Sequence, residues 1–189
     1  MIDPRLSSAL ADRYRLEREI GAGRMGTVYL AEDLRHRRTV TVKVLHPALS
    51  ATLEHERFLR EITTTAGLRH PNILPVYESG ESAGFLFYVT PLVEGERLRD
   101  RLTRVGPLPL DEALRFADDI ANALSYAHGH GVMHRDITPE NIFIERGHAM
   151  MADVGIAQAV DSAGDDTRTV AGTGVGMAVG APTYMSPEQ

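Results

Sequence analysis

The sequence has no cysteine, and Lys43 is the single lysine among its 20 basic residues. Without cysteine the chain forms no disulfide bond and offers no thiolate for catalysis. It has no apolar run long enough to span a membrane and no apolar leader after Met1, so we expect a cytoplasmic protein without a membrane span. A net charge of −6 and the lack of long basic blocks argue against a nucleic-acid partner.

The composition is that of an ordinary soluble globular protein. Of the 189 residues, 43% are hydrophobic and 24% are charged, which is enough apolar material for a core in one or two domains. Arginine serves as the cation everywhere else, so we interpret Lys43 as a position that needs the compact ammonium group of lysine. A lysine retained there by chance is the alternative.

A series of motifs along the chain carries the functional information. The glycine-rich sequence Gly-Ala-Gly-Arg-Met-Gly at 21–26 lies between two segments whose patterns predict strands, 14–20 and 27–31. Alone, this sequence also fits a glycine-rich hairpin, and before a helix it would suggest a dinucleotide site. A β-branched run at 39–45 predicts a further strand, which carries Lys43. Then come His-Arg-Asp at 134–136 with Asn141, Asp-Val-Gly at 153–155 and Ser-Pro-Glu at 186–188.

The order and spacing of these motifs resemble those of bacterial, eukaryotic-like serine/threonine protein kinases over nearly the whole chain. The resemblance implies an α+β, two-lobe fold, with an antiparallel N-lobe sheet and one helix before an incomplete, mainly helical C-lobe. We expect a lead at 1–11, the N-lobe at 12–90, a hinge at 91–95 and the partial C-lobe at 96–189. Because the family's domain continues into further helices, we expect a truncated domain whose uncovered C-lobe surface makes it either poorly soluble or dependent on a partner that covers it.

By this resemblance, the chain transfers the γ-phosphate of ATP to serine or threonine hydroxyls of a protein substrate, with Mg²⁺ as cofactor. Asp136 would take the proton of the hydroxyl, and Lys43, fixed by Glu61, would bind the α- and β-phosphates. Asn141 and Asp153 would hold the magnesium ion. The implied nucleotide-binding residues are Gly21, Gly23, Gly26, Val28, Lys43, Pro91, Val93 and Phe143, with the Pro91 carbonyl and the Val93 N–H facing adenine.

A helix is predicted over residues 51–67, and it carries Glu61. Leu59, Ile62 and Ala66 recur at helical spacing. Glu61 lies at the edge of this apolar stripe, which favours a partner inside the site; a surface ion pair with Arg57 is the alternative. Further strands are expected at 73–77 and 85–90, a short helix at 96–104 and a long amphipathic helix at 110–127.

Three departures from the family's pattern bear on activity. Thr138 stands where serine/threonine kinases carry a lysine, Ala181 replaces a threonine, and Val154 replaces the phenylalanine of Asp-Phe-Gly. Losing a preorganised cation at position 138 would cost roughly 10²–10³ in rate. The alternative hypothesis is therefore a catalytically impaired pseudokinase, or a truncated remnant, that binds nucleotide or a partner.

The segment from 153 to 188 resembles a kinase activation segment. Thr167, Thr169 and Thr173 are candidate phosphorylation sites there, and Arg135 is the cation that would hold a phosphate. The alternative is that they are ordinary polar loop residues.

Overall fold

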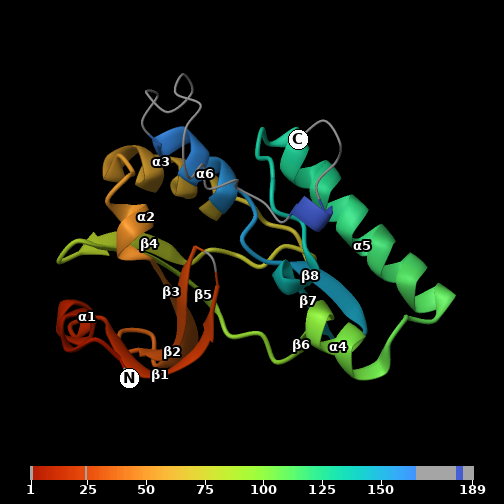
Figure 1. The fold of residues 1–189 in the computed structure, drawn as a ribbon, viewed down its shortest axis with the longest axis horizontal. Coiled ribbons are helices and arrows are strands. Elements are labelled where there is room, and N and C mark those ends of the chain that lie inside the picture. Colours follow the sequence, from red (N-terminus) through yellow and green to blue (C-terminus); the bar gives the residue numbers. More distant parts are fainter. Residues whose placement is uncertain (1, 24, 165–181, 185–189) are drawn as a thin grey trace.

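The computed structural model describes residues 2–23, 25–164 and 182–184, which form two sheets with their covering helices (Figure 1). Strand β5 ends at Pro91 and strand β6 begins at Glu96, so residues 92–95 connect the two sheets. The candidate phosphorylation sites, Ala181 and the Ser-Pro-Glu motif lie outside the described residues.

The N-terminal sheet is antiparallel, as predicted, with the strand order β1-β2-β3-β5-β4. Its strands are β1 (Tyr14–Ala22), β2 (Gly26–Asp33), β3 (Arg38–Leu45), β4 (Glu78–Ser82) and β5 (Phe85–Pro91). Side chains alternate between the two faces because the period of a strand is two. On β3, Val42 and Val44 join the cluster beneath helix α1, whereas Leu45 joins the cluster beneath helix α3.

Each face of this sheet is covered by helices. Helix α1 (Pro4–Leu10) covers one face, and Asp3 caps it by accepting a 2.8 Å hydrogen bond from the Arg5 N–H. On the other face lie α2 (Pro47–Ser50), α3 (His55–Ala66) and α6 (Ile156–Ala163). Figure 1 shows α3 and α6 side by side. Helix α6 comes from a distant part of the sequence, so it ties the C-terminal part of the described chain to the N-terminal sheet.

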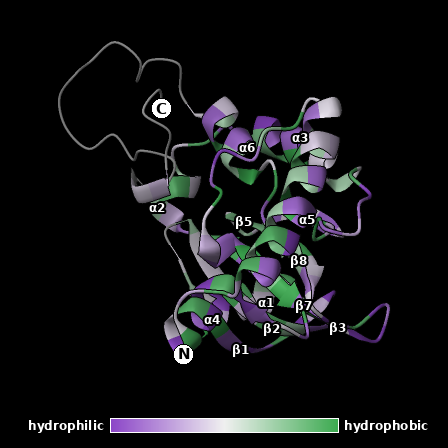
Figure 2. Ribbon diagram, turned by 90° about the vertical axis from the view of Figure 1, so that its right-hand side faces the viewer, coloured by the Kyte–Doolittle hydropathy of each residue, from purple (hydrophilic) through white to green (hydrophobic). Residues whose placement is uncertain are grey.

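The second lobe is built on the long helix α5 (Leu110–Gly129), close to the predicted 110–127. It packs against a small sheet of β6 (Glu96–Arg97), β7 (Ile142–Glu145) and β8 (His148–Met151), beside α4 (Leu98–Val105) and the short 3-10 turns Pro139–Asn141 and Pro182–Tyr184. Figure 2 shows hydrophobic and hydrophilic residues mixed along α5. Phe116 is buried, whereas Leu110 and Leu114 are 74% and 61% exposed. Part of the apolar stripe of α5 is thus uncovered by the described residues, as expected.

The strand predicted at 73–77 was wrong, because β4 begins only at Glu78. Ile73, Leu74 and Val76 are buried, so their apolar pattern reflects the core rather than a strand. The backbone bonds instead to separate partners: Leu74 N–H donates to Met151 and Tyr77 N–H to Val89, both at 2.8 Å. Pro75 has no N–H to donate to a ladder.

Helix α6 was not predicted, since 153–188 was interpreted as a single activation segment. Its apolar residues nevertheless recur at helical spacing. Those that are buried are Ile156, Ala157, Ala159, Val160 and Ala163. Across the described ranges, no helix combines the length and apolar character needed to cross a bilayer.

Candidate active site

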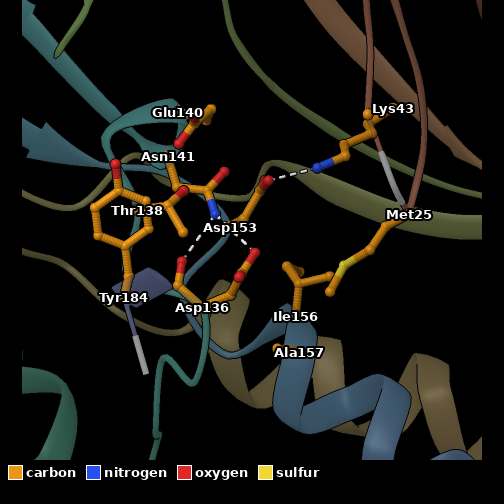
Figure 3. Close-up of a pocket in the computed structure, with 11 residues that line it drawn as sticks. Met25, Lys43, Asp136, Thr138, Glu140, Asn141, Asp153, Ile156, Ala157 and Tyr184 are labelled. Atoms are coloured by element: carbon orange, nitrogen blue, oxygen red, sulfur yellow. Dashed lines mark hydrogen bonds and ion pairs between the residues drawn. The ribbon is translucent and has the colours of Figure 1, made fainter. Parts of the chain in front are cut away.

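Two neighbouring cavities, of about 480 and about 310 Å³, lie between the lobes and share residues. The larger one is lined by the glycine-rich loop, the 91–95 connection and β7. The smaller one is lined by the 134–141 loop, the start of α6 and Lys43 (Figure 3). Lys43, Asn141 and Asp153 border both cavities, so the two together form one continuous cleft.

The glycine-rich loop lies close to β3 because Gly26 has no side chain to keep the two segments apart. A Cβ at Gly26 would meet the Val44 carbonyl oxygen, so even alanine there would require the backbone to shift. The Gly23 N–H donates to the Gly26 carbonyl at 2.9 Å, and the His46 ring lies 2.8 Å from the Gly23 carbonyl. These contacts hold the loop over the cleft, where Gly21 and Gly23 line the larger cavity.

Lys43 pairs with Asp153 across the cleft (Figure 3). Their side chains are only 17% and 18% exposed, so the ion pair is largely shielded from water. Within residues 2–23, 25–164 and 182–184, Glu61 makes no ion pair, either with Lys43 or with Arg57. The structure therefore does not contain the Lys43–Glu61 contact that the resemblance implied.

The packing of α6 accounts for the position of Glu61. Ile156 and Val160 of α6 share one hydrophobic cluster with Phe58 and Ile62 of α3. The inward face of α3 thus contacts α6, while Lys43 is taken by Asp153 from the segment just before α6.

Asp153 has a second partner, Tyr88 of β5, whose hydroxyl donates to Asp153 Oδ1 at 2.6 Å. Burial alone would raise the pKa of Asp153, but the charge and hydrogen bond of Lys43, with that of Tyr88, outweigh it and lower the pKa. Burial, together with the Asp153 charge, raises the pKa of Tyr88 well above its usual value. The carboxylate is therefore ionised and the phenol protonated at neutral pH.

The 134–141 loop holds Asp136 through Asn141 and His134. The Asn141 side-chain amide donates to the Asp136 carbonyl at 2.9 Å and to Asp136 Oδ2 at 3.0 Å. His134 is buried, and burial lowers its pKa, so the ring is neutral. Its Nδ1 accepts from the Asp136 N–H at 3.3 Å, and its Nε2 donates to the Ala152 carbonyl at 3.1 Å. The first bond fixes the shape of the loop, and the second fixes its position relative to the end of β8.

The donor atoms at this end of the cleft fit a magnesium ion. Because the Asn141 nitrogen is engaged with Asp136, its amide oxygen remains for a ligand, beside the Asp153 carboxylate. Mg²⁺ prefers such hard oxygen donors and usually keeps several waters. No group of three or more His, Asp or Glu gathers for a metal in the part of the chain that the structure describes, so water or phosphate oxygens would complete the coordination.

The larger cavity has the dimensions and the mixed lining of a small-molecule site. Val28, Pro91, Val93 and Phe143, the residues that the resemblance assigns to adenine, all border this cavity. At its inner end the Thr41 and Thr90 hydroxyls share a 2.6 Å hydrogen bond.

Sequence reasoning missed several residues of the cleft. Met25 of the glycine-rich loop packs against the α3–α6 cluster, and Ile156 and Ala157 line the smaller cavity. Arg97 lies 5.6 Å from the Phe143 ring centre at the mouth of the larger cavity. For α6 the helical spacing was the available signal; for Arg97 no sequence pattern pointed to the cleft.

Arg135, the cation expected to hold a phosphate, pairs with Asp161 of α6 at 2.9 Å; the threonines proposed to carry that phosphate lie outside the described residues. Thr138 is buried, with 6% of its surface exposed, and lines the smaller cavity next to Asp136.

A glycine-rich loop, a largely shielded Lys–Asp pair and a loop carrying Asp136 and Asn141 thus surround one cleft between the two lobes. The family model of the protein kinase domain matches residues 14–189. The serine/threonine-protein kinase PknA of Mycobacterium tuberculosis is 42% identical over 195 residues, covering 100% of this chain and 44% of PknA. The serine/threonine-protein kinase PrkC of Bacillus subtilis is 37% identical over 186 residues, covering 97% of this chain and 28% of PrkC.

A crystal structure of a mutant of the PknI kinase domain of Mycobacterium tuberculosis matches with a TM-score of 0.70 and 37% identity, over 76% of this chain and 59% of that one. The chain belongs to the protein kinase family. It spans less than half the length of the curated relatives PknA and PrkC.

Proposed function

We propose that the cleft binds ATP with Mg²⁺ and that the chain transfers the γ-phosphate to serine or threonine hydroxyls of a protein substrate. The observation that carries this proposal is the meeting of Lys43, Asp136, Asn141 and Asp153 around one cavity. These four residues come from three separate stretches of sequence. The family match and the serine/threonine kinase relatives support the same reaction.

Asp136 is the residue that receives the substrate hydroxyl. Its carboxylate is oriented by the Asn141 amide and its backbone by His134, so it keeps one direction relative to the cavity. In phosphoryl transfer the protein mainly positions the groups and neutralises charge, which makes a fixed carboxylate valuable. Asp136 would accept the hydroxyl proton as the oxygen attacks phosphorus.

The phosphates would lie between the glycine-rich loop and Lys43. Backbone N–H groups of the loop and the Lys43 ammonium offer donors to phosphate oxygens. Asn141 and Asp153 would hold Mg²⁺, which when bound supplies neutralisation of the phosphate charge. Since Lys43 is paired with Asp153 in the structure, phosphate oxygens would compete with that carboxylate for the ammonium group.

At the other end of the cleft, adenine would lie between Val28 and Phe143, both of which line the larger cavity. The Pro91 carbonyl and the Val93 N–H are the backbone groups proposed to bond to the base. Proline lacks an N–H but keeps its carbonyl, so Pro91 can serve as an acceptor.

The test is transfer of label from radiolabelled ATP to casein, comparing wild type with Asp136→Asn. We expect incorporation in the wild type and its loss in the variant, while the matched exposed change Asp118→Asn on α5 leaves it unaltered. Equal background in all three would support the pseudokinase alternative instead. Binding is tested separately by nucleotide-dependent thermal stabilisation, which Lys43→Ala should abolish.

Position 138 allows a further test of the same reaction. Thr138 borders Asp136 in the smaller cavity, where a cation would lie near the transferring phosphate. We expect Thr138→Lys to raise the rate of label incorporation, by up to roughly 10²-fold if a preorganised charge is restored. An unchanged rate would show that this position does not limit transfer.

A further inference from the structure

Tyr88 is one of the largest fully buried side chains, with 1% of its surface exposed. It lies on β5 directly opposite Lys43 of β3 in the antiparallel register, so both side chains point to the same face of the sheet. Its ring belongs to the cluster shared by α3 and α6, and its hydroxyl end reaches the larger cavity. A residue from a central strand thus extends to the inner end of the cleft.

The Tyr88 hydroxyl is a polar group within an apolar cluster, and such groups are costly to bury without a partner. Asp153 Oδ1 is that partner, at 2.6 Å. Packing in the cluster uses the ring, which phenylalanine would also provide. The hydroxyl group of Tyr88 therefore serves the hydrogen bond to Asp153 and is not needed for packing in the core.

The backbone of Asp153 has a φ of +59°, in the left-handed region that aspartate adopts more readily than most residues. Its side chain is oriented by two partners. The two carboxylate oxygens are held from two neighbouring strands, Oδ1 by Tyr88 and Oδ2 by Lys43. Glu61 on α3 makes no ion pair with Lys43, so the strands β3 and β5 provide the orientation that α3 does not.

We propose that Tyr88 is a positioning residue for Asp153, holding Oδ1 so that the carboxylate faces the cavity in the orientation that binds magnesium. This inference rests on the proposed function only as far as binding of Mg²⁺ and nucleotide. Tyr88 itself donates to the carboxylate and does not contact the reacting atoms. Its loss changes how strongly metal binds while leaving contacts with the base and the glycine-rich loop in place.

The variant Tyr88→Phe removes only the oxygen and keeps the ring in the cluster. A matched control exists in the same lobe, because Tyr14 is also buried and its hydroxyl donates to the Glu78 carboxylate at 2.9 Å. Tyr14→Phe thus removes an equivalent hydrogen bond far from the cleft. A purely structural role for Tyr88 would make the two variants behave alike.

The measurement is thermal stabilisation of the full chain by the non-hydrolysable analogue AMP-PNP, first with EDTA and then across a Mg²⁺ titration. We expect Tyr88→Phe to keep the metal-free stabilisation and to raise the half-saturating Mg²⁺ concentration by about tenfold, the size expected for a hydrogen bond to a charged group. Tyr14→Phe should lower the melting temperature without moving the Mg²⁺ midpoint. An unchanged midpoint in Tyr88→Phe overturns the proposal.

A second measurement needs no altered Tyr88. The wild-type chain is labelled with 3-fluorotyrosine, and the buried fluorine resonance of Tyr88 is distinguished from that of Tyr14 because Tyr14→Phe does not remove it. This resonance should shift when Mg²⁺ is added to the AMP-PNP complex. A resonance that does not shift overturns the proposal. Because AMP-PNP binding requires no transfer, a chain that binds Mg²⁺ and nucleotide but never phosphorylates casein refutes the proposed reaction while leaving Tyr88 testable. A wild type that gains nothing from Mg²⁺ overturns both.

Discussion

Replacing Lys43 with methionine should destabilise the chain through Asp153 rather than through Glu61. Methionine keeps most of the aliphatic length of lysine and removes the charge. Among the described residues, the Asp153 carboxylate, which is 18% exposed, would then retain only the Tyr88 hydrogen bond. Breaking a buried pair typically costs about 3–5 kcal/mol, and because some water reaches both groups we expect about 3 kcal/mol.

A double-mutant cycle distinguishes the two candidate partners. Asp153→Asn removes the orphaned charge, so the Lys43→Met and Asp153→Asn double variant should be more stable than additivity predicts, with a coupling energy of about 2 kcal/mol. The equivalent cycle with Glu61→Gln should give less than about 0.5 kcal/mol, the usual deviation for independent sites. The structural reason is that Lys43 forms its ion pair with Asp153 and not with Glu61.

The assay is urea unfolding of the four chains in each cycle, at one ionic strength and without nucleotide, with a single cooperative transition required in each. A coupling energy concentrated in the Lys43–Glu61 cycle would refute the arrangement described here. It would mean that α3 in solution turns Glu61 toward the cleft and that α6 does not hold the position seen in the structure.

Two further predictions concern stability. A hydrogen bond to Glu81 raises the pKa of His55. The stability that His55 contributes is therefore fully present below the unfolded pKa near 6.5 and is lost as pH rises through the raised pKa, so His55→Gln should lower the melting temperature at about pH 5.5 and much less at about pH 8.5. Equal losses at the two pH values would contradict this titration. Gly26→Ala should cost about 1–3 kcal/mol because its Cβ meets the Val44 carbonyl, whereas Gly23→Ala, with nothing within 4 Å, should cost far less in the same melts.

Local patterns predicted much of the fold. Alternation placed Val42 and Lys43 on opposite faces of one strand, and that depends only on the period of two. The order and spacing of the motifs also predicted that Asp136, Asn141 and Asp153 would lie near Lys43. All four residues line the smaller cavity. Each of these positions is determined by a short stretch of sequence with its own turn or strand.

The remaining features depend on contacts between distant segments. Whether Glu61 meets Lys43 is decided by how α6 packs on α3, and neither segment contains that information alone. The role of Tyr88 is similar, since a tyrosine in a strand is usually a packing residue and its partner lies 65 positions later. The strand wrongly predicted at 73–77 has a local cause, because buried residues beside Pro75 mimic strand periodicity.

Ile156 and Ala157 belong at once to helix α6 and to the wall of the cavity beside Lys43 (Figure 3). If helix α6 were displaced, its displacement would therefore be linked to occupancy of that cavity, and the linkage would be reciprocal. A ligand that binds more tightly when α6 is packed on α3 would make this helix harder to displace. A protein that displaces the helix would lower the affinity of that ligand by the same factor. For a typical coupling of about 1–3 kcal/mol, that factor is roughly 5 to 150.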